Sequence, residues 1–492
     1  MNDPFSHLPD EIVIEIALFK PFANITRLCQ SSAHFNNVIC NNNIFWRQKF
    51  ILDFGNPPVN IISWKNAYLN YGKVFYFGAG HLKTPVIQGP RSEHKVPIEI
   101  PKIRAKSVDC GETHTVLISL NNDVLSFGRN ENGQLGLGDN DIRYTPTILP
   151  NIKAKAVSCG DYHTALIDLD NNILVFGNNE WGHLGFNEDI EYIHIPTKLE
   201  NVKAKSISCG GFHTMFIGLD DELWGFGNNR EGQLGLGTIG VENTPRKIGI
   251  KARQVACGSS HTVIIDFDDN LWGWGSTQDG QLALENFMYV VPTQILSDAG
   301  ENLKAKFVTC GSDCTMIIDL DDNVLVFGNN MYGQLGLGDM INRNVPTILT
   351  VNDKNLKAKN ISSCVAHTMI IDLDDNVWGF GSNSSGQLGL GDNADRFKPT
   401  QIPNLKAKTL ACGNAHTVVI SNSGANEILV DFDEVHRMLN SGHFRNFNFL
   451  PEYQIIPHNP NNYIATFFGK DGNIYLAELH YDQTTNQIFP PI

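Results

Sequence analysis

The chain has 492 residues, of which 42% are hydrophobic and 18% are charged, and a formal net charge of −15. No apolar run approaches the ~20 residues that a membrane-spanning helix needs, and the acidic balance argues against a nucleic-acid partner. The N-terminus lacks the basic start and long apolar core of a secretory signal. We therefore expect an intracellular protein, cytoplasmic or nuclear, whose 10 cysteines are reduced thiols.

Residues 1–50 have apolar positions at helical spacing. Pro9 and Asp10 fit a helix start, and Ile12, Ile16 and Phe19 fall on one helix face. The segment resembles an F-box, a small all-α module that docks on the Skp adaptor of a cullin-based ubiquitin ligase. The resemblance implies adaptor contacts by Leu8, Pro9, Glu11, Ile12, Ile16, Leu28, Cys29, Phe35 and Trp46. The alternative is a small helical cap on the next domain, and residues 51–72 indicate a helical linker.

A pattern CGxxHT then recurs along the chain, starting at residues 110, 159, 209, 257 and 412, with weaker copies at 310 and 363. The anchor positions lie 48 to 53 residues apart, and a second motif, FGxNxxGQLG, follows six of the seven copies. Each unit predicts four short strands without a helix. A period of ~40–50 residues is typical of a β-propeller, in which four-stranded sheets stack around an axis.

The two ends of the repeat predict how the ring closes. The seventh anchor, at Cys412, has no FG motif after it, whereas "KVFYFGAG" at 73–80 has an FG motif without an anchor. We therefore expect a seven-bladed propeller over 73–424, whose last blade pairs the strands near Cys412 with residues 73–78. Such a closure leaves no open sheet edge. The predicted fold class is mainly β, a seven-bladed β-propeller preceded by the small all-α F-box domain.

The two motifs together resemble the regulator of chromosome condensation repeat, a family of seven-bladed propellers. The founding member exchanges nucleotide on the small GTPase Ran and binds nucleosomes. The wedge-like insertion and basic tail associated with those activities are missing from this chain. It also departs from the repeat at the fourth loop, which is GQLA, at Cys314 in place of His, and at Ser363-Cys364 in place of CG. A scaffold tolerates such changes better than a shared catalytic centre does.

Cys and His four residues apart suggest zinc ligands, but the repeat argues against a metal. Equivalent residues of neighbouring blades should lie about 10 Å apart, whereas zinc needs four ligands at about 2.0–2.3 Å. We predict a structural role, with each His hydrogen-bonded locally, and no catalytic residue, metal or cofactor. The GQLGLG loops lack the Lys of a phosphate loop, and the Asp-rich turns lack the Gly and Glu of an EF-hand.

The two rims of the ring differ in their predicted roles. Each unit has a basic couple before its first strand, and strand order places these couples on the same rim as the Asp-rich turns. The couples are Arg104/Lys106, Lys153/Lys155, Lys203/Lys205, Lys251/Arg253, Lys304/Lys306, Lys357/Lys359 and Lys406/Lys408. The opposite charges should neutralise each other, so this rim is not expected to bind polyanions.

On the opposite rim, two residues vary from blade to blade inside the otherwise constant FGxNxxGQLG loop. Variable tips on a rigid frame are typical of recognition surfaces, and Trp and Tyr are common at binding hot spots. The candidate client-binding residues, called the loop-tip residues below, are Glu131, Asn132, Glu180, Trp181, Arg230, Glu231, Gln278, Asp279, Met331, Tyr332, Ser384 and Ser385. Ordinary surface variation is the alternative.

Residues 425–492 lie outside the repeat. "FDEVHRMLNS" predicts one short helix, and residues 463–479 predict a hairpin turning at Asp471-Gly472. This extension either caps the ring or competes with residues 73–78 for closing it.

The sequence as a whole indicates a non-catalytic adaptor. Its F-box would bind a Skp-like adaptor and cullin, and its propeller would bind a client protein of unknown identity. A regulator of a Ran-like GTPase and a propeller scaffold without a role in ubiquitination are the alternatives.

Overall fold

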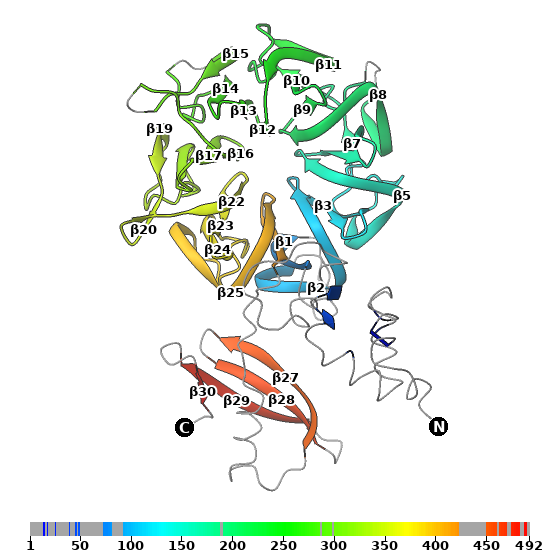
Figure 1. Cartoon of the computed structure of the whole chain (residues 1–492), viewed down its shortest axis with the longest axis vertical. Coiled ribbons are helices and arrows are strands. Elements are labelled where there is room, and N and C mark those ends of the chain that lie inside the picture. Colours follow the sequence, from blue (N-terminus) through cyan, green and yellow to red (C-terminus); the bar gives the residue numbers. More distant parts are fainter. Residues whose placement is uncertain are drawn as a thin grey trace. The chain divides into compact units, whose positions relative to one another are not determined.

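The structure is a computed structural model of the whole chain, divided into two compact units, residues 1–425 and 426–492. It describes residues 72–80, 92–186, 190–285, 288–297 and 300–422, nine single residues between 13 and 49, and the backbone of 449–459, 462–469, 474–482 and 487–489. The described strands of the first unit form a ring of blades (Figure 1).

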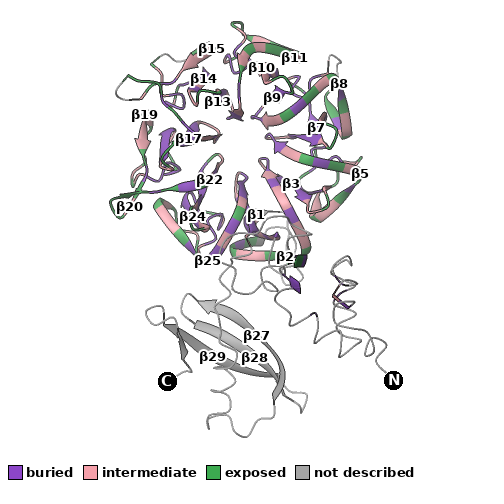
Figure 2. Cartoon of the chain, viewed as in Figure 1, coloured by how far each residue is buried: buried purple, intermediate pink, exposed green. Residues whose placement is uncertain are grey.

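One blade shows why the repeat folds as it does. β12 (Gln254–Cys257), β13 (His261–Ile265), β14 (Leu271–Ser276) and β15 (Met288–Gln294) form an antiparallel sheet in chain order. All five residues of β13 are buried, whereas no residue of the outermost strand β15 is. The second strand is apolar on both faces because each blade packs between two neighbours, and burial decreases from the inner to the outer strands (Figure 2).

Neighbouring blades often share one long strand, which differs from the expected separate short strands. β8 pairs with β7 through Tyr192–Lys203 and then with β9 through Ala204–Cys209, so it is the outer strand of one blade and the inner strand of the next. Asn201, at the bend between the two parts, has a left-handed φ of 61°. Asn tolerates this conformation, so one residue turns the chain where a separate loop was expected.

The first three blades contain β2 (Ser92–Cys110), β3 (His114–Ser119), β4 (Asp123–Gly128), β5 (Arg143–Cys159), β6 (His163–Asp168), β7 (Asn172–Asn178), β8 (Tyr192–Cys209), β9 (His213–Gly218), β10 (Glu222–Asn229) and β11 (Gly240–Lys251). The fifth and sixth contain β16 (Phe307–Cys310), β17 (Cys314–Ile318), β18 (Val324–Gly328), β19 (Arg343–Ile348), β22 (Ala358–Ser363), β23 (His367–Asp372), β24 (Asn376–Gly381) and β25 (Arg396–Cys412). A small hairpin, β20 (Thr350–Val351) and β21 (Lys354–Asn355), lies between these two blades and accounts for one of the longer repeat steps.

The seventh blade joins the two ends of the ring. β1 (Lys73–Gly80) pairs with β26 (His416–Ser421), with Val74 opposite Ile420 and Gly78 opposite His416. β1 also pairs with β2, and β26 with β25, so the described strands make seven four-stranded blades. The pairing predicted between residues 73–78 and the strand after Cys412 is confirmed. Because β1 begins beside the end of β26, the chain enters and leaves the ring on the same rim.

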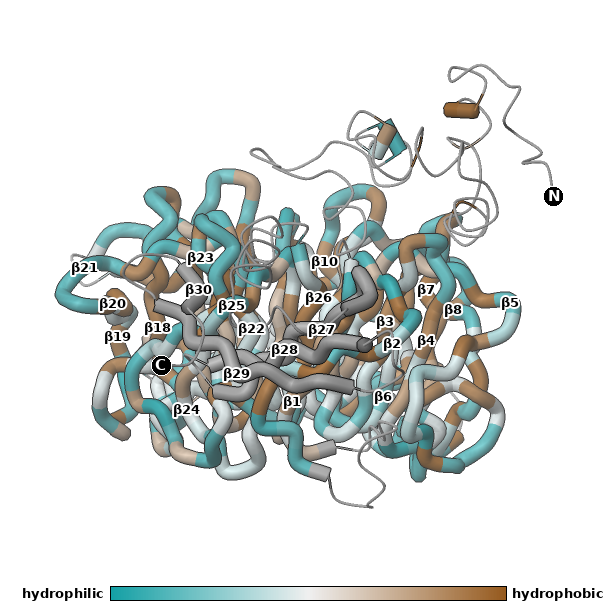
Figure 3. Tube along the Cα trace, turned by 90° about the horizontal axis from the view of Figure 1, so that it is seen from below, coloured by the Kyte–Doolittle hydropathy of each residue, from teal (hydrophilic) through white to brown (hydrophobic). Residues whose placement is uncertain are grey.

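Adjacent blades pack through the aromatic residue of each FG motif. A Cβ added at Gly235 would lie 2.9 Å from the Trp274 ring of the next blade, so the second glycine of GQLG makes room for that ring. Ala283 replaces this glycine in the fourth loop and still adopts a positive φ of 51°. The backbone of the fourth loop therefore follows the same path as in the other loops, and Ala283 is strained because it adopts a conformation that favours glycine. Seen from its edge, the ring has hydrophobic strands between rims rich in hydrophilic loops (Figure 3).

The second unit contains one antiparallel sheet of β27 (Phe449–Asn459), β28 (Asn462–Gly469), β29 (Ile474–Asp482) and β30 (Gln487–Phe489). The predicted hairpin is confirmed, since Phe468 pairs with Ile474. Its turn at Asp471-Gly472 and the helix predicted in "FDEVHRMLNS" lie outside the described residues. The flanking strands β27 and β30 were not predicted, and the position that closes the ring is held by β1.

Few residues before the ring are described, and all nine are helical. Among the predicted adaptor contacts only Trp46 is described: it is buried, and its ring lies edge-on to Phe45 at 5.2 Å between centroids. Leu8, Pro9, Glu11, Ile12, Ile16, Leu28, Cys29 and Phe35 lie outside the described residues. Among the residues with assigned positions, no helix is both long and apolar enough to cross a bilayer.

Candidate functional site

Each CGxxHT copy forms the turn between the innermost strand of a blade and its second strand, at the centre of the ring. Its His bonds the Thr of the next blade: His213 Nε2 lies 3.0 Å from Thr262 Oγ1, and the Thr262 hydroxyl donates to the Gln233 carbonyl at 2.8 Å. A hydroxyl has only one hydrogen to donate, so the histidine must donate through Nε2–H. We call this contact a His–Thr joint.

Within the described strands, six such joints link the blades, with N···O distances of 2.9 to 3.1 Å. They are His114–Thr164, His163–Thr214, His213–Thr262, His261–Thr315, His367–Thr417 and His416–Thr115. Burial lowers the pKa of His114, His213, His261 and His367 to about 3, and it also holds the pKa of His163 well below its usual value. These side chains are therefore neutral at physiological pH. The local hydrogen bonding predicted for these histidines is present, but it runs between blades rather than within one.

The other ring nitrogen explains the glycine of the motif. A Cβ at Gly258 would lie 2.2 Å from Cε1 and 2.4 Å from Nδ1 of His261, so a side chain at this position would collide with the imidazole. His261 Nδ1 is buried without a hydrogen-bond partner in the described part of the chain. Both ring nitrogens are thus covered by protein, one bonded to Thr315 and one packed over Gly258.

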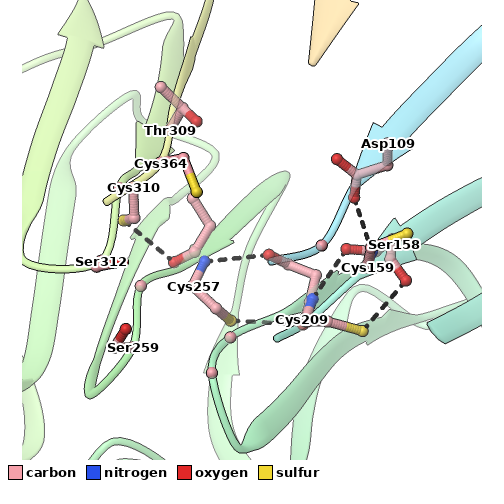
Figure 4. A pocket seen from close by; sticks show the side chains of 18 of the residues that line it. Asp109, Ser158, Cys159, Cys209, Cys257, Ser259, Thr309, Cys310, Ser312 and Cys364 are labelled. Carbon is pink, nitrogen blue, oxygen red and sulfur yellow. Dashed lines mark hydrogen bonds between the residues drawn. The ribbon is translucent and has the colours of Figure 1, made fainter. Parts of the chain in front are cut away.

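The cysteines of the motif also link blades. Cys209 Sγ lies 3.5 Å from the Ser158 carbonyl, and Cys209 N–H donates to Ser158 Oγ at 2.9 Å (Figure 4). Burial raises the pKa of Cys257 to about 12, so the thiol is protonated and donates to the Ser208 carbonyl. Within the described residues, no group of three or more His, Cys, Asp or Glu side chains is arranged to hold a metal ion.

One joint is built differently. Cys314 replaces the histidine of the fifth blade, and Thr368 of the sixth blade instead has Ser363 Oγ at 2.9 Å. Cys314 Sγ lies 3.6 Å from the same Ser363 hydroxyl. The two departures from the repeat, Cys314 and Ser363, therefore meet at one contact between blades.

The loop-tip residues lie in turns on the same rim as the CGxxHT turns, and none is fully buried. The loop glutamine fixes the backbone of five of these turns: Gln334 Oε1, for example, accepts the Tyr332 N–H at 2.9 Å. The side chains of Met331 and Tyr332 are 59% and 49% exposed. Rigid backbone with exposed, variable side chains fits the predicted recognition role, which stays a prediction.

Two loop-tip residues from neighbouring blades contact each other. The Arg230 guanidinium carbon lies 4.4 Å from the centre of the Trp181 ring, and the edge of this ring faces Phe212 at 6.5 Å. The ring centres of Tyr162 and Phe212 lie 6.3 Å apart. We call Tyr162, Trp181 and Phe212 the aromatic shelf.

Sequence reasoning missed the variable pair inside CGxxHT, which includes Tyr162 and Phe212 of the shelf. The same pair supplies Glu112, Asp161 and Asp313, three half-buried acids near the centre of this rim. The sequence contained the signal for a predicted recognition surface at these positions. Two variable positions lie within the constant CGxxHT motif, as two variable positions lie within the FGxNxxGQLG loop.

The opposite rim carries the basic couples, and in five of the seven couples one residue forms an ion pair with an aspartate. Lys153 Nζ lies 2.5 Å from Asp123 Oδ1, and Arg253 donates to Asp269 at 2.7 Å. The pairs Lys205–Asp221, Lys306–Asp322 and Lys359–Asp375 repeat the contact around the ring.

Comparison with protein families agrees with the blade architecture. A model described as RCC1-like domain matches residues 197–428, and one for the regulator of chromosome condensation (RCC1) repeat matches 121–167 and 170–217. A second RCC1 repeat model matches 105–134 and 154–182. The chain contains an RCC1-like propeller domain.

Relatives share these RCC1-like repeats over about a quarter of the chain. The ultraviolet-B receptor UVR8 of Arabidopsis thaliana is 32% identical over 126 residues, which are 25% of this chain and 28% of the receptor. The probable E3 ubiquitin-protein ligase HERC3 of Homo sapiens is 32% identical over 120 residues, 24% of this chain and 11% of the ligase. The chain thus spans under a third of the curated relatives it matches.

Solved structures share the fold. Human WBSCR16 has a TM-score of 0.62 at 24% identity and covers 71% of this chain and 99% of its own. Prp20p of Saccharomyces cerevisiae, described with its binding to Gsp1p and histones, has a TM-score of 0.63 at 19% identity, over 76% of this chain and 96% of its own. These identities support a common fold and nothing finer.

Proposed function

We propose that this protein is a non-catalytic, substrate-recruiting subunit of a Skp-cullin-F-box type ubiquitin ligase. The N-terminal segment docks the Skp-like adaptor, and the RCC1-like propeller binds the client protein. The observation that carries the proposal is the F-box pattern directly before a propeller, because a domain that follows an F-box serves to capture a substrate. RCC1-like repeats also occur in the HERC ligases, which associates the same fold with ubiquitin transfer.

The geometry of the ring supports a division of labour between its rims. Residues 72–73 enter and residues 421–422 leave the ring on the rim of neutralised Lys–Asp pairs. The loop-tip residues lie on the other rim, away from both chain connections. A client bound there does not compete with the connections to the rest of the chain.

Capture of the adaptor tests this proposal. The full-length chain is expected to retain a purified Skp-type adaptor on affinity resin, and L8A/P9A is expected to lose it. The matched control is Y332A on the propeller rim, which should retain the adaptor fully. Failure of the unaltered chain to bind the adaptor would disprove the proposal.

A second function, regulation of a Ran-like GTPase, is favoured by the common fold with Prp20p, a protein described as binding Gsp1p. Its test is nucleotide release: faster loss of labelled GDP from a Ran-like GTPase in the presence of the full-length chain supports it. A scaffold without either activity predicts negative results in both experiments.

A further inference from the structure

The centre of the loop-tip rim holds a small polar cavity. Its volume is about 220 Å³, and the CGxxHT turns of the blades line it, with Glu112 and Asp161 among the lining side chains. Small-molecule sites usually measure ~300–1,000 Å³, so this cavity suits a single side chain better than a free cofactor. The cavity and the aromatic shelf are adjacent along the chain, because Tyr162 and Phe212 directly follow the lining residues Asp161 and Gly211.

Acidic side chains dominate this opening. Burial, then the charges of Glu112 and Asp313, raise the pKa of Asp161 to about 6. Burial, then the charge of Asp279, raises the pKa of Asp313. Among the described residues neither Asp161 nor Asp313 has an ion-pair partner, in contrast to the paired aspartates of the opposite rim. A cation placed here would relieve the repulsion that these carboxylates exert on one another.

A second, independent contact points to the same kind of ligand. Arg230 lays its guanidinium over the Trp181 ring at 4.4 Å, which shows that the shelf accepts a planar cation on its face. Arg230 is exposed, so this internal contact is open to exchange. Glu112, then burial, raises the pKa of the Tyr162 hydroxyl to about 12, which places the shelf next to the acidic opening.

We propose that this surface binds a basic segment of the partner protein. One arginine side chain enters the cavity beside Glu112 and Asp161, where the charge of Asp313 also acts, and a neighbouring one stacks on Trp181 in place of Arg230. Arginine fits better than lysine, because its planar guanidinium both stacks on an aromatic face and bonds carboxylates in pairs. The inference rests on the proposed function only in taking this partner to be the client.

The test uses the full-length chain and a fluorescein-labelled hexaarginine peptide, with hexacitrulline as the uncharged control of the same shape. Fluorescence anisotropy should detect hexaarginine binding and much weaker hexacitrulline binding. D161N/D313N should weaken hexaarginine binding at least about tenfold, because two desolvated charge contacts are lost. The matched control D170N/D321N removes the same charge from the opposite rim and should change affinity less than about twofold.

Substitution of Arg230 should increase the affinity for hexaarginine instead of decreasing it. R230Q removes the internal competitor for Trp181 and should tighten hexaarginine binding about threefold, whereas R246Q, with the same change in net charge, should not. W181A should weaken binding, and W181F should restore part of it. Circular dichroism melting confirms that each variant is folded.

Three results overturn the inference: no hexaarginine binding, equal binding of hexacitrulline, or equal losses in D161N/D313N and D170N/D321N. The last would mean that only the net charge of the chain attracts the peptide. Adaptor capture separates the two proposals, because D161N/D313N should still bind the Skp-type adaptor. Adaptor capture without peptide binding refutes only this surface, and peptide binding without adaptor capture refutes only the ligase role.

Discussion

Two contacts between blades differ in chemistry although they occupy equivalent positions. Between the third and fourth blades, His213 donates to Thr262, which in turn donates to the Gln233 carbonyl. Between the fifth and sixth blades, Thr368 still donates to the Gln334 carbonyl, but its second partner is the Ser363 hydroxyl of its own blade. The threonine keeps two partners in both cases. The comparison indicates that the ring requires a satisfied buried hydroxyl rather than a histidine as such.

The two contacts also differ in their response to pH, because the histidine titrates and the Cys314 contact does not. The pKa of His213 is lowered to about 3, so the unfolded chain, with an ordinary histidine pKa near 6.5, takes up protons first as the pH falls. Stability is therefore complete above about pH 6.5 and decreases toward pH 3, by up to about 1.4 kcal/mol per pH unit for each such histidine. The Cys314 contact has no group that titrates in this range.

Acidification is expected to produce the largest effect. Six histidines have lowered pKa values, five from the His–Thr joints and His183. They oppose three aspartates with raised pKa values, Asp109 and Asp161 at about 6 and Asp313, which gain stability as they protonate when the pH falls. The histidines dominate, so the free energy of unfolding should fall by several kcal/mol between pH 6.5 and 4. Urea unfolding at a series of pH values measures this. A constant stability would contradict the assignment of neutral, buried histidines.

Truncation of the two contacts should give unequal losses. H213A removes a buried ring and one hydrogen bond of Thr262, and should cost about 3 kcal/mol of unfolding free energy. C314A removes only a sulfur, and Thr368 keeps its Ser363 partner, so about 1 kcal/mol is expected. Urea unfolding at pH 7 compares them. Equal losses would mean that the histidine stabilises the ring no more than the cysteine does.

Restoring the repeat at the odd contact should give the smallest and most specific effect. C314H and S363C each disturb a contact that the other residue completes, so both single variants should be less stable than the unaltered chain. The double variant C314H/S363C rebuilds a His–Thr joint with Thr368, and should recover about 1–2 kcal/mol relative to the sum of the single losses. Space for the ring exists, since Gly311 is retained beneath position 314. If the losses in unfolding free energy of C314H and S363C simply add in the double variant, positions 314 and 363 are not coupled.

The sequence was sufficient for the local features of the ring. The period, the two motifs and the mismatch between seven anchors and six loops predicted the blades and the strand that closes them, because strand length, turn residues and apolar runs are local properties. Strand order also predicted that Lys153 and Asp123 lie on one rim, and they form an ion pair there. The sharing of long strands between blades was missed, because a single left-handed residue such as Asn201 turns the chain where a loop was expected.

The sequence by itself therefore determined the repeat, the number of blades and the rim on which each motif lies. It could do so because each repeated residue meets the same local steric requirement in every copy. Only the tertiary structure decided which copies touch. It joined Cys314 to Ser363 across 49 residues, placed Arg230 on Trp181, and brought Asp161 and Asp313 of different blades close enough for their charges to interact. Such contacts depend on closing the ring, which brings together residues that no single repeat contains.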